Sequence, residues 1–317
     1  MKGKRYRGWH SRSWAFTLEF TRMALHKHIS KHPETEHLPE DVVHYREYKI
    51  LLQPDHFTSK RGFLEFWEDV RKTVKKLDLK VDIDQQGFHS QVREVLFYDT
   101  PEFDLYNNHF ILRKRTFYEE GWPRPDHELT LKYRNPDLKA AARVDVRPRL
   151  GGHEAIKFKE ELLLERDRLG GMRSVYSHGC VLVSPKIELD RGIENITEAF
   201  PALSNIDVHP KTKIELVNSV AVEEVQNTIG FIHFGHHYKG KATIAIWRNR
   251  ALEKSLSGEF AFQCKFDRLE EVHKSSVQLS EDFYKTVQLD CAEWIKLGTT
   301  KTAMVYGLGN VPVKNRE

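Results

Sequence analysis

Hydrophobic and polar residues alternate with a period of two through much of this chain. Such alternation over about four to eight residues is typical of a strand with one face against a hydrophobic core. The alternating segments predict strands at 43–52, 92–99, 109–117, 127–134, 142–147, 155–160, 180–190, 211–222, 228–235, 241–250 and 257–266. We therefore expect a predominantly antiparallel β structure that begins near residue 43.

Other segments have helical spacing. In 59–77, hydrophobic residues recur at intervals of three and four, as at Phe63, Phe66 and Val70, which predicts an amphipathic helix. A second helix is predicted at 280–296 and a short one at 102–107. We expect the two long helices to cover the outside of the sheet, so the predicted fold class is α+β.

Positive charges share one face of two neighbouring predicted strands. Arg113 and Arg115 lie on one face of the first, and Lys132 and Arg134 on one face of the second, with hydrophobic residues opposite. Cations at alternate positions repel one another unless they are solvated, paired with carboxylates or bound to a polyanion. Two structures remain open: a one-sided sheet with its charged face in water, or a closed barrel with a charged interior.

The same division into a charged and a hydrophobic face recurs in other predicted strands. Further charged residues on such faces are Glu47, Lys49, Arg143, Lys213, Glu215, Glu259 and Lys265. Inside a closed barrel, the cations would bind the oxygens of a polyanion. The carboxylates would hold a divalent metal ion beside it.

Composition narrows the class of protein only in part. The 317 residues are 39% hydrophobic and 30% charged, with a formal net charge of +4, which indicates a soluble globular protein. Cys180, Cys264 and Cys291 are odd in number and far apart, which argues against a disulfide framework and indicates the cytoplasm. No hydrophobic run reaches the roughly 18 residues of a membrane span, so we expect no membrane partner.

The two ends of the chain are expected to lie outside the main domain. The first 32 residues hold many Lys, Arg and His but a single acid, Glu19. We predict a basic N-terminal extension at 1–39, a β domain at 40–310 and a C-terminal tail at 311–317. The extension is compatible with a solvated segment, an organelle transit peptide or a nucleic-acid-binding arm.

Motifs of the commonest phosphotransfer enzymes are absent from the sequence. It contains no Walker loop, no kinase motif set and no Gly-x-Ser-x-Gly elbow. His233, His236 and His237 lie close together but lack the spacing of a zinc site. We interpret these histidines as loop or strand-edge residues.

Short motifs, in order along residues 43–306, resemble the CYTH domain, also called the triphosphate tunnel metalloenzyme superfamily. They are Glu47-Tyr48-Lys49, Phe97-Tyr98-Asp99-Thr100, Leu112-Arg113-Lys114-Arg115, Thr130-Leu131-Lys132, Glu259, and Lys301-Thr302-Ala303 near Tyr306. Their order is more specific than any single motif. The resemblance implies a closed eight-stranded tunnel, binding of triphosphate-bearing substrates, and hydrolysis or cyclisation that depends on Mg²⁺ or Mn²⁺.

The chain departs from this family at several acids, so we class it as a divergent member. The opening pattern Glu-x-Glu-x-Lys has Tyr45 in place of its first acid, and Ala261 replaces the second acid of a late Glu-x-Glu. The strand at 244–250 has no acid either. Candidate replacement ligands are Glu161, Glu188, Asp190 and Glu215. The smaller acid set would still bind polyanions but would hold metal less well.

The resemblance implies a role for each candidate residue. Glu47 and Lys49 are the predicted catalytic residues, and Glu47, Glu259 and Glu215 the predicted metal ligands. The predicted substrate-binding residues are Arg113, Arg115, Lys132, Arg134, Arg143, Lys213 and Lys265.

Three functions remain open from the sequence. The first is a metal-dependent phosphohydrolase that cleaves tripolyphosphate or a nucleoside or thiamine triphosphate. The second is a non-catalytic tunnel that binds polyphosphate or a nucleotide. The third is an RNA-end-binding protein, indicated by the basic N-terminus.

Overall fold

The computed structural model describes residues 41–84, 88–149, 154–189 and 192–309. The predicted extension at 1–39 and the predicted tail at 311–317 lie outside the described residues.

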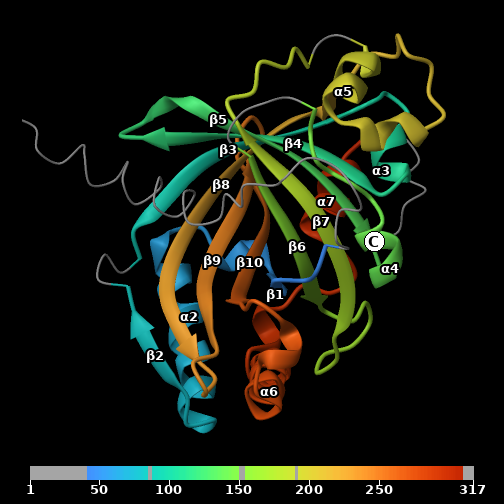
Figure 1. The fold of residues 1–317 in the computed structure, drawn as a ribbon. Helices are drawn as coiled ribbons and strands as arrows, with labels where there is room; N and C mark the ends of the chain where they lie inside the picture. The colour runs from blue at the N-terminus through green and yellow to red at the C-terminus, as the bar shows by residue number, and fades with distance from the viewer. Residues whose placement is uncertain (1–40, 85–87, 150–153, 190–191, 310–317) are drawn as a thin grey trace, which may run out of the picture. The chain divides into compact units, whose positions relative to one another are not determined.

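Within the described residues, nine strands form a closed barrel and a tenth, β2, pairs with it from outside (Figure 1). The strands are β1 (Tyr45–Leu52), β2 (Lys80–Ile83), β3 (Ser90–Asp99), β4 (Phe110–Glu119), β5 (Trp122–Asn135), β6 (Glu154–Leu163), β7 (Arg173–Val183), β8 (Glu215–His233), β9 (Lys239–Asn249) and β10 (Lys254–Lys265). The barrel order is β8-β3-β4-β5-β7-β6-β1-β10-β9, and β9 pairs again with β8. The predicted closed barrel is confirmed, with nine strands in place of eight.

Antiparallel pairing joins all these strands except β1 and β6, which are parallel. The helices are α2 (Lys60–Lys76), α3 (Asp104–Asn107), α4 (Leu138–Ala142), α5 (Ile193–Ala199), α6 (Lys274–Asp290) and α7 (Lys301–Tyr306). Short 3-10 turns are η1 (Pro54–His56), η2 (Pro201–Asn205), η3 (Leu269–Glu271) and η4 (Ala292–Trp294). None of the described helices has the length and apolarity needed to span a membrane.

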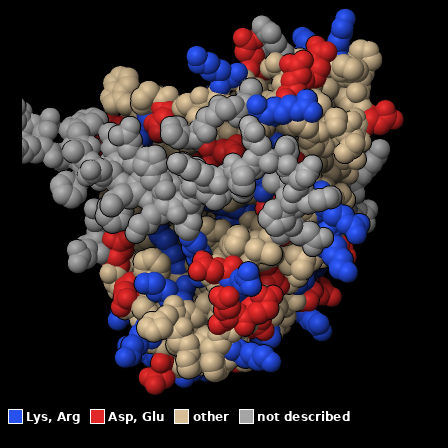
Figure 2. All heavy atoms as spheres, in the orientation of Figure 1, with Lys and Arg blue, Asp and Glu red and all other residues tan. Residues whose placement is uncertain are grey.

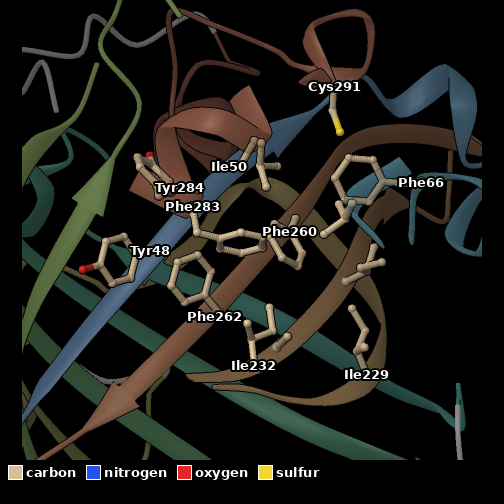
Figure 3. Close-up of a cluster of buried hydrophobic side chains, with 14 of the residues drawn as sticks. Tyr48, Ile50, Phe66, Ile229, Ile232, Phe260, Phe262, Phe283, Tyr284 and Cys291 are labelled. Carbon is tan, nitrogen blue, oxygen red and sulfur yellow. The ribbon is translucent and has the colours of Figure 1, made fainter. Parts of the chain in front are cut away.

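The outer face of the barrel is hydrophobic where α2 and α6 cover it (Figure 3). Tyr48 from β1 stacks on Phe262 from β10, with ring centroids 4.4 Å apart. Phe66 from α2 and Phe283 from α6 contact the same β10 surface edge-on. Burial of these large side chains supplies the main stabilisation of this wall, and it forces the alternate residues of β1 and β10 to face the interior.

A second hydrophobic cluster fills one end of the barrel interior. Trp247 from β9 and Phe97 from β3 pack there with Tyr306 of α7. Tyr306 in turn stacks on Tyr106 of α3, with ring centroids 4.0 Å apart. This aromatic cluster ties the C-terminal helix α7 to the barrel.

Asp99, the last residue of β3, holds this end in place. Its buried carboxylate accepts hydrogen bonds from the backbone N–H groups of Thr100, Leu105 and Tyr106. It also accepts one from the hydroxyl of Tyr306, at 3.0 Å. The carboxylate therefore satisfies the first N–H groups of α3 and joins α3 to α7.

Several predicted elements differ from the structure, among them the strand at 180–190, of which only 180–183 is strand, as the end of β7. The predicted strand at 142–147 is wrong: a helix, α4, whose N-cap is Asp137, occupies 138–142, Arg143 caps its end, and 144–148 form no regular structure. The predicted strands at 211–222 and 228–235 are one strand, β8. The predicted helix at 280–296 begins earlier, at Lys274, because Ser276 and Ser280 occupy its buried face, and two serines do not register as a hydrophobic stripe.

We predict that Tyr306→Phe lowers the free energy of unfolding by about 1–3 kcal/mol, because the buried Asp99 carboxylate loses a hydrogen-bond donor. Urea denaturation of the purified chain measures this. Tyr118→Phe is the matched control, since the described residues offer no hydrogen-bond partner to the Tyr118 hydroxyl. Equal losses in the two variants would show that the Asp99 contact is not stabilising.

Candidate functional site

The barrel encloses a cavity of about 460 Å³ whose described lining is strongly basic. The cations are Lys49, Arg93, Arg113, Arg115, Lys132, Arg134, Lys157, Lys159, Arg173, Lys241 and Lys301, and the acids are Glu47, Glu224 and Glu259. On the outer face seen in Figure 2, by contrast, Lys and Arg are interspersed with Asp and Glu. Positive charge is therefore concentrated inside the barrel, where it is least screened by solvent.

One cluster of charges joins side chains of β1, β5 and β6, with β7 lying between β5 and β6 in the sheet. Glu161 is fully buried, and its carboxylate lies 2.7 Å from Lys132 Nζ and 3.1 Å from Lys49 Nζ. It also accepts a hydrogen bond from Arg134. Burial opposes ionisation of Glu161, but the charges of Arg134, Lys132 and Lys49 hold its pKa well below the ordinary value.

Glu47 lies beside this first cluster. Its Oε2 atom lies 3.0 Å from Lys49 Nζ and 3.2 Å from Lys159 Nζ. Burial opposes its ionisation too, but Lys159 and Lys49 hold the pKa of Glu47 well below its usual range. Glu47 is therefore an anion that fixes two lysines, and it is a weak proton acceptor.

A second cluster lies on β3, β8, β10 and α7. Glu224 is buried and pairs with Arg93. Lys301 Nζ lies 2.7 Å from Glu259 Oε1 and 3.5 Å from Glu224 Oε1. The same ammonium lies over the ring of Trp247, 4.5 Å from its centroid. A single lysine from α7 thus joins two carboxylates that come from different strands.

Arg113 and Arg115 differ from the charges of these two clusters. Neither guanidinium lies within ion-pair distance of a carboxylate in the described part of the chain. The buried Nε atoms of both arginines, and the buried Oγ1 of Thr130 on the neighbouring strand, have no hydrogen-bond partner. Burial, and then the charges of Arg113 and Arg93, lower the pKa of Arg115 to about 9. These groups form a site that is complementary to an oxyanion.

Lys132 has a pKa close to neutrality. Burial lowers it, Glu161 opposes the change, and the charges of Lys49 and Arg134 add to it, so that the pKa of Lys132 is about 7. A lysine of this kind exchanges a proton near neutral pH, which an ordinary lysine does not.

The structure brings together seven of the residues predicted from the sequence. Those that line the cavity are Glu47, Lys49, Arg113, Arg115, Lys132, Arg134 and Glu259. They alternate along strands whose opposite faces are buried outside the barrel, which is why the period-two pattern identified them. Their roles in binding or catalysis remain predictions.

The other four predicted site residues, Arg143, Lys213, Glu215 and Lys265, lie outside this described lining and are exposed. Arg143 follows α4 instead of lying in a strand. Lys213 precedes β8, and Glu215 begins it, opposite Asp99. Lys265 keeps the inward alternation but is the last residue of β10.

Several lining cations were not predicted. Lys157 and Lys159 alternate with Ile156 and Phe158 in β6, so the same pattern that identified Arg113 and Arg115 contained them. Lys301 reaches the cavity from a helix, so no strand alternation could have identified it.

The carboxylates do not form a protein-held metal site. No three Asp, Glu, His or Cys side chains of the described residues are grouped so as to hold a metal ion. Glu47 and Glu259 are each bonded to lysines, and the third predicted ligand, Glu215, lies elsewhere. Among the other candidate ligands, Glu161 is bonded to cations, and Asp190 lies outside the described residues. The residues present do not fit the predicted metal-binding role.

Comparison with known proteins gives distant structural similarity only. No known family profile matches the sequence, and no curated protein matches it. The chain is similar to a candidate adenylyl cyclase from Hippeastrum, whose structure is described as revealing a dominant triphosphatase activity, with 14% identity, a TM-score of 0.40, and 86% of this chain and 99% of that chain covered. It is also similar to a candidate adenylate cyclase from Bacillus halodurans, with 12% identity, a TM-score of 0.37, and 82% and 95% covered.

We predict opposite stability changes for two charge removals in the cavity. Glu161→Gln should lower the free energy of unfolding by about 3–5 kcal/mol, because it leaves buried cations uncompensated. Arg115→Met should raise it by about 1 kcal/mol, because it removes an unpaired cation. Guanidinium denaturation of both variants measures the two changes, and a loss of similar size in Arg115→Met would refute the unpaired state of this arginine.

We also predict that anion binding weakens as pH rises through 7. The folded pKa of Lys132 lies below that of an unfolded lysine, so the charge that attracts an anion is lost above pH 7. Tripolyphosphate affinity measured by calorimetry should fall by up to about tenfold per pH unit between pH 7 and 9. Lys132→Arg, whose charge does not titrate in this range, should remove the slope, and an unchanged slope in this variant would assign it to another group.

Proposed function

We propose that this protein is a phosphohydrolase that cleaves a triphosphate-bearing substrate bound inside the barrel. The observation that carries the proposal is the pair Arg113 and Arg115, two inward cations without a carboxylate partner in the described structure. Burial of an unpaired charge lowers the stability of a protein, so a bound anion would offset the electrostatic repulsion between the two arginines.

The size and charge of the cavity support a short polyanion as the ligand. A volume of about 460 Å³ lies within the range of small-molecule sites. Eight more cations than acids line it, so a ligand with several negative charges is matched better than a single carboxylate. Arginine forms paired hydrogen bonds with phosphate oxygens, which favours a phosphate chain with one phosphate at Arg113 and Arg115.

Hydrolysis in this site would be an attack of water on a terminal phosphorus atom. The new bond joins the water oxygen to phosphorus, and the bond from that phosphorus to the bridging oxygen breaks. Lys132 in its neutral form would accept the proton that water releases. Arg113 and Arg115 would neutralise the charge on the transferred group, while Glu47 would keep Lys49 and Lys159 in position.

We propose that Mg²⁺ or Mn²⁺ enters as a counter-ion of the substrate. The carboxylates of the described cavity are bonded to protein cations, so they offer no ready set of metal ligands. Magnesium is commonly bound through substrate phosphates with few protein ligands, which is compatible with this arrangement.

A protein that binds polyphosphate or a nucleotide without cleaving it is the second candidate. The pairing of the cavity acids with lysine and arginine favours it, because those acids are then not available to activate water. The RNA-end alternative depends on residues 1–39, which lie outside the described residues.

We expect the native chain to release phosphate from tripolyphosphate or from ATP with Mg²⁺ or Mn²⁺. Arg113→Ala should reduce the rate by about 100-fold or more, because a donor to the transferred phosphate is lost. Arg143→Ala is the matched control, since Arg143 is an exposed arginine outside the described cavity lining. A colorimetric phosphate assay measures the rates.

The assay also separates the two candidate functions. No release by the native chain, together with tripolyphosphate binding that Arg113→Ala weakens, would exclude the hydrolase and leave the binding protein. Equal rates in Arg113→Ala and Arg143→Ala would exclude the cavity as the active site.

A further inference from the structure

We propose that Lys301 is a built-in cation that occupies, between Glu224 and Glu259, a position where a divalent metal ion would otherwise bind. The inference goes beyond the proposed function, because it assigns a latent metal site and the residue that fills it. It rests on the second charge cluster, which contains the two acids of the described lining that come from β8 and β10.

The geometry is that of one cation held by two carboxylates. Lys301 Nζ lies 2.7 Å from Glu259 and 3.5 Å from Glu224. Its side chain is largely buried, with 14% of its surface exposed, and those of Glu259 and Glu224 are 12% and 2% exposed. Two carboxylates that converge in a poorly solvated place require a positive charge between them, and an ammonium or a hard metal ion would each supply it.

The position of Lys301 is fixed by the chain around it. The Thr300 side chain accepts a hydrogen bond from the N–H of Ala303 and begins α7, and Tyr306 at the other end of α7 packs in the aromatic cluster. The ammonium also contacts the ring of Trp247, a favourable cation–π arrangement. These contacts hold the charge without the coordination shell that a metal ion needs.

The other cations of the cavity differ from Lys301. Arg93 also pairs with Glu224, but it lies beside Gln226 on the barrel wall and contacts only one of the two acids. Lys241 lines the same cavity and has no carboxylate partner within the described residues. Removal of Lys301 therefore frees Oε1 of Glu259 on β10 and Oε1 of Glu224 on β8, while Oε2 of Glu224 stays bonded to Arg93.

The test titrates the full-length chain with Mn²⁺ alone. Electron paramagnetic resonance measures the concentration of the free ion. Lys301→Gln removes the charge and adds an amide oxygen on a side chain one bond shorter than that of lysine, so that a third oxygen ligand is available beside the two carboxylates. We expect Lys301→Gln to bind Mn²⁺ at least tenfold more tightly than the native chain. Adding Glu259→Gln to that variant should abolish the gain.

Lys241→Gln is the matched control. It removes the same charge from the same cavity, so it reproduces any general increase in attraction for cations, but it frees no carboxylate. Equal Mn²⁺ affinity in Lys301→Gln and Lys241→Gln, or in Lys301→Gln and the native chain, would overturn the proposal. Thermal unfolding and circular dichroism establish that each variant is folded, and Lys301→Met serves in place of Lys301→Gln if the amide variant does not fold.

A second measurement addresses the consequence for the ligand and rests on the proposed function. In the presence of EDTA, the native chain should bind tripolyphosphate, and Lys301→Gln should lose at least tenfold in affinity, which added Mn²⁺ restores. If neither the native chain nor Lys301→Gln binds tripolyphosphate, but Lys301→Gln gains Mn²⁺ affinity as expected, the proposed function fails and the role of Lys301 stands. If tripolyphosphate binds in EDTA but the Mn²⁺ gain is missing, the proposal for Lys301 fails alone.

Discussion

The arrangement of this molecule depends on repulsion among cations that a closed sheet confines. Closure removes the inward side chains from bulk water, so their charges interact more strongly than they would on a surface. Two buried acids, Glu161 and Glu224, pair with five of the eleven cations of the described lining, and each joins cations that come from different elements. Arg113 and Arg115 remain outside these networks, and this imbalance gives the cavity its preference for an anion.

Hydrophobic packing outside the barrel offsets the destabilising effect of this excess of positive charge. Aromatic side chains of β1 and β10 pack against α2 and α6, and the aromatic cluster around Tyr306 fills one end of the interior. The stabilisation from these hydrophobic contacts is independent of the charges, so the barrel does not require a fully neutral interior. Hydrophobic residues on the outer face and at one end of the interior thus stabilise the fold, and the inward charged residues bind and position charge.

The period-two pattern was sufficient to predict most strands and which of their residues share a face, but it could not predict which strands pair with one another. It identified Arg113, Arg115 and Lys132 because each strand alternates between the same two environments along its length. Whether the charged face met water or a lumen was decided by the pairing of β8 with β9, between residues far from those arginines. The role predicted for Arg143 depended on a strand that does not form, because Arg143 follows α4. Lys301 stood in the motif Lys301-Thr302-Ala303, but strand alternation gave it no site role, because a helical residue enters a barrel by tertiary packing.

The pairing of β1 with β10 also determines at what stage of chain synthesis the cavity can form. Tyr45, near the start of the barrel, lies opposite Lys265, near its end, and synthesis of the chain between them takes on the order of 10–40 s at typical ribosomal rates. Until β10 emerges, β1 has a hydrophobic face and an unpaired edge, both of which favour aggregation. Long-range pairing of this kind also slows folding. The cavity is therefore one of the last features of the nascent chain to form, and α7, which carries Lys301, follows β10 out of the ribosome.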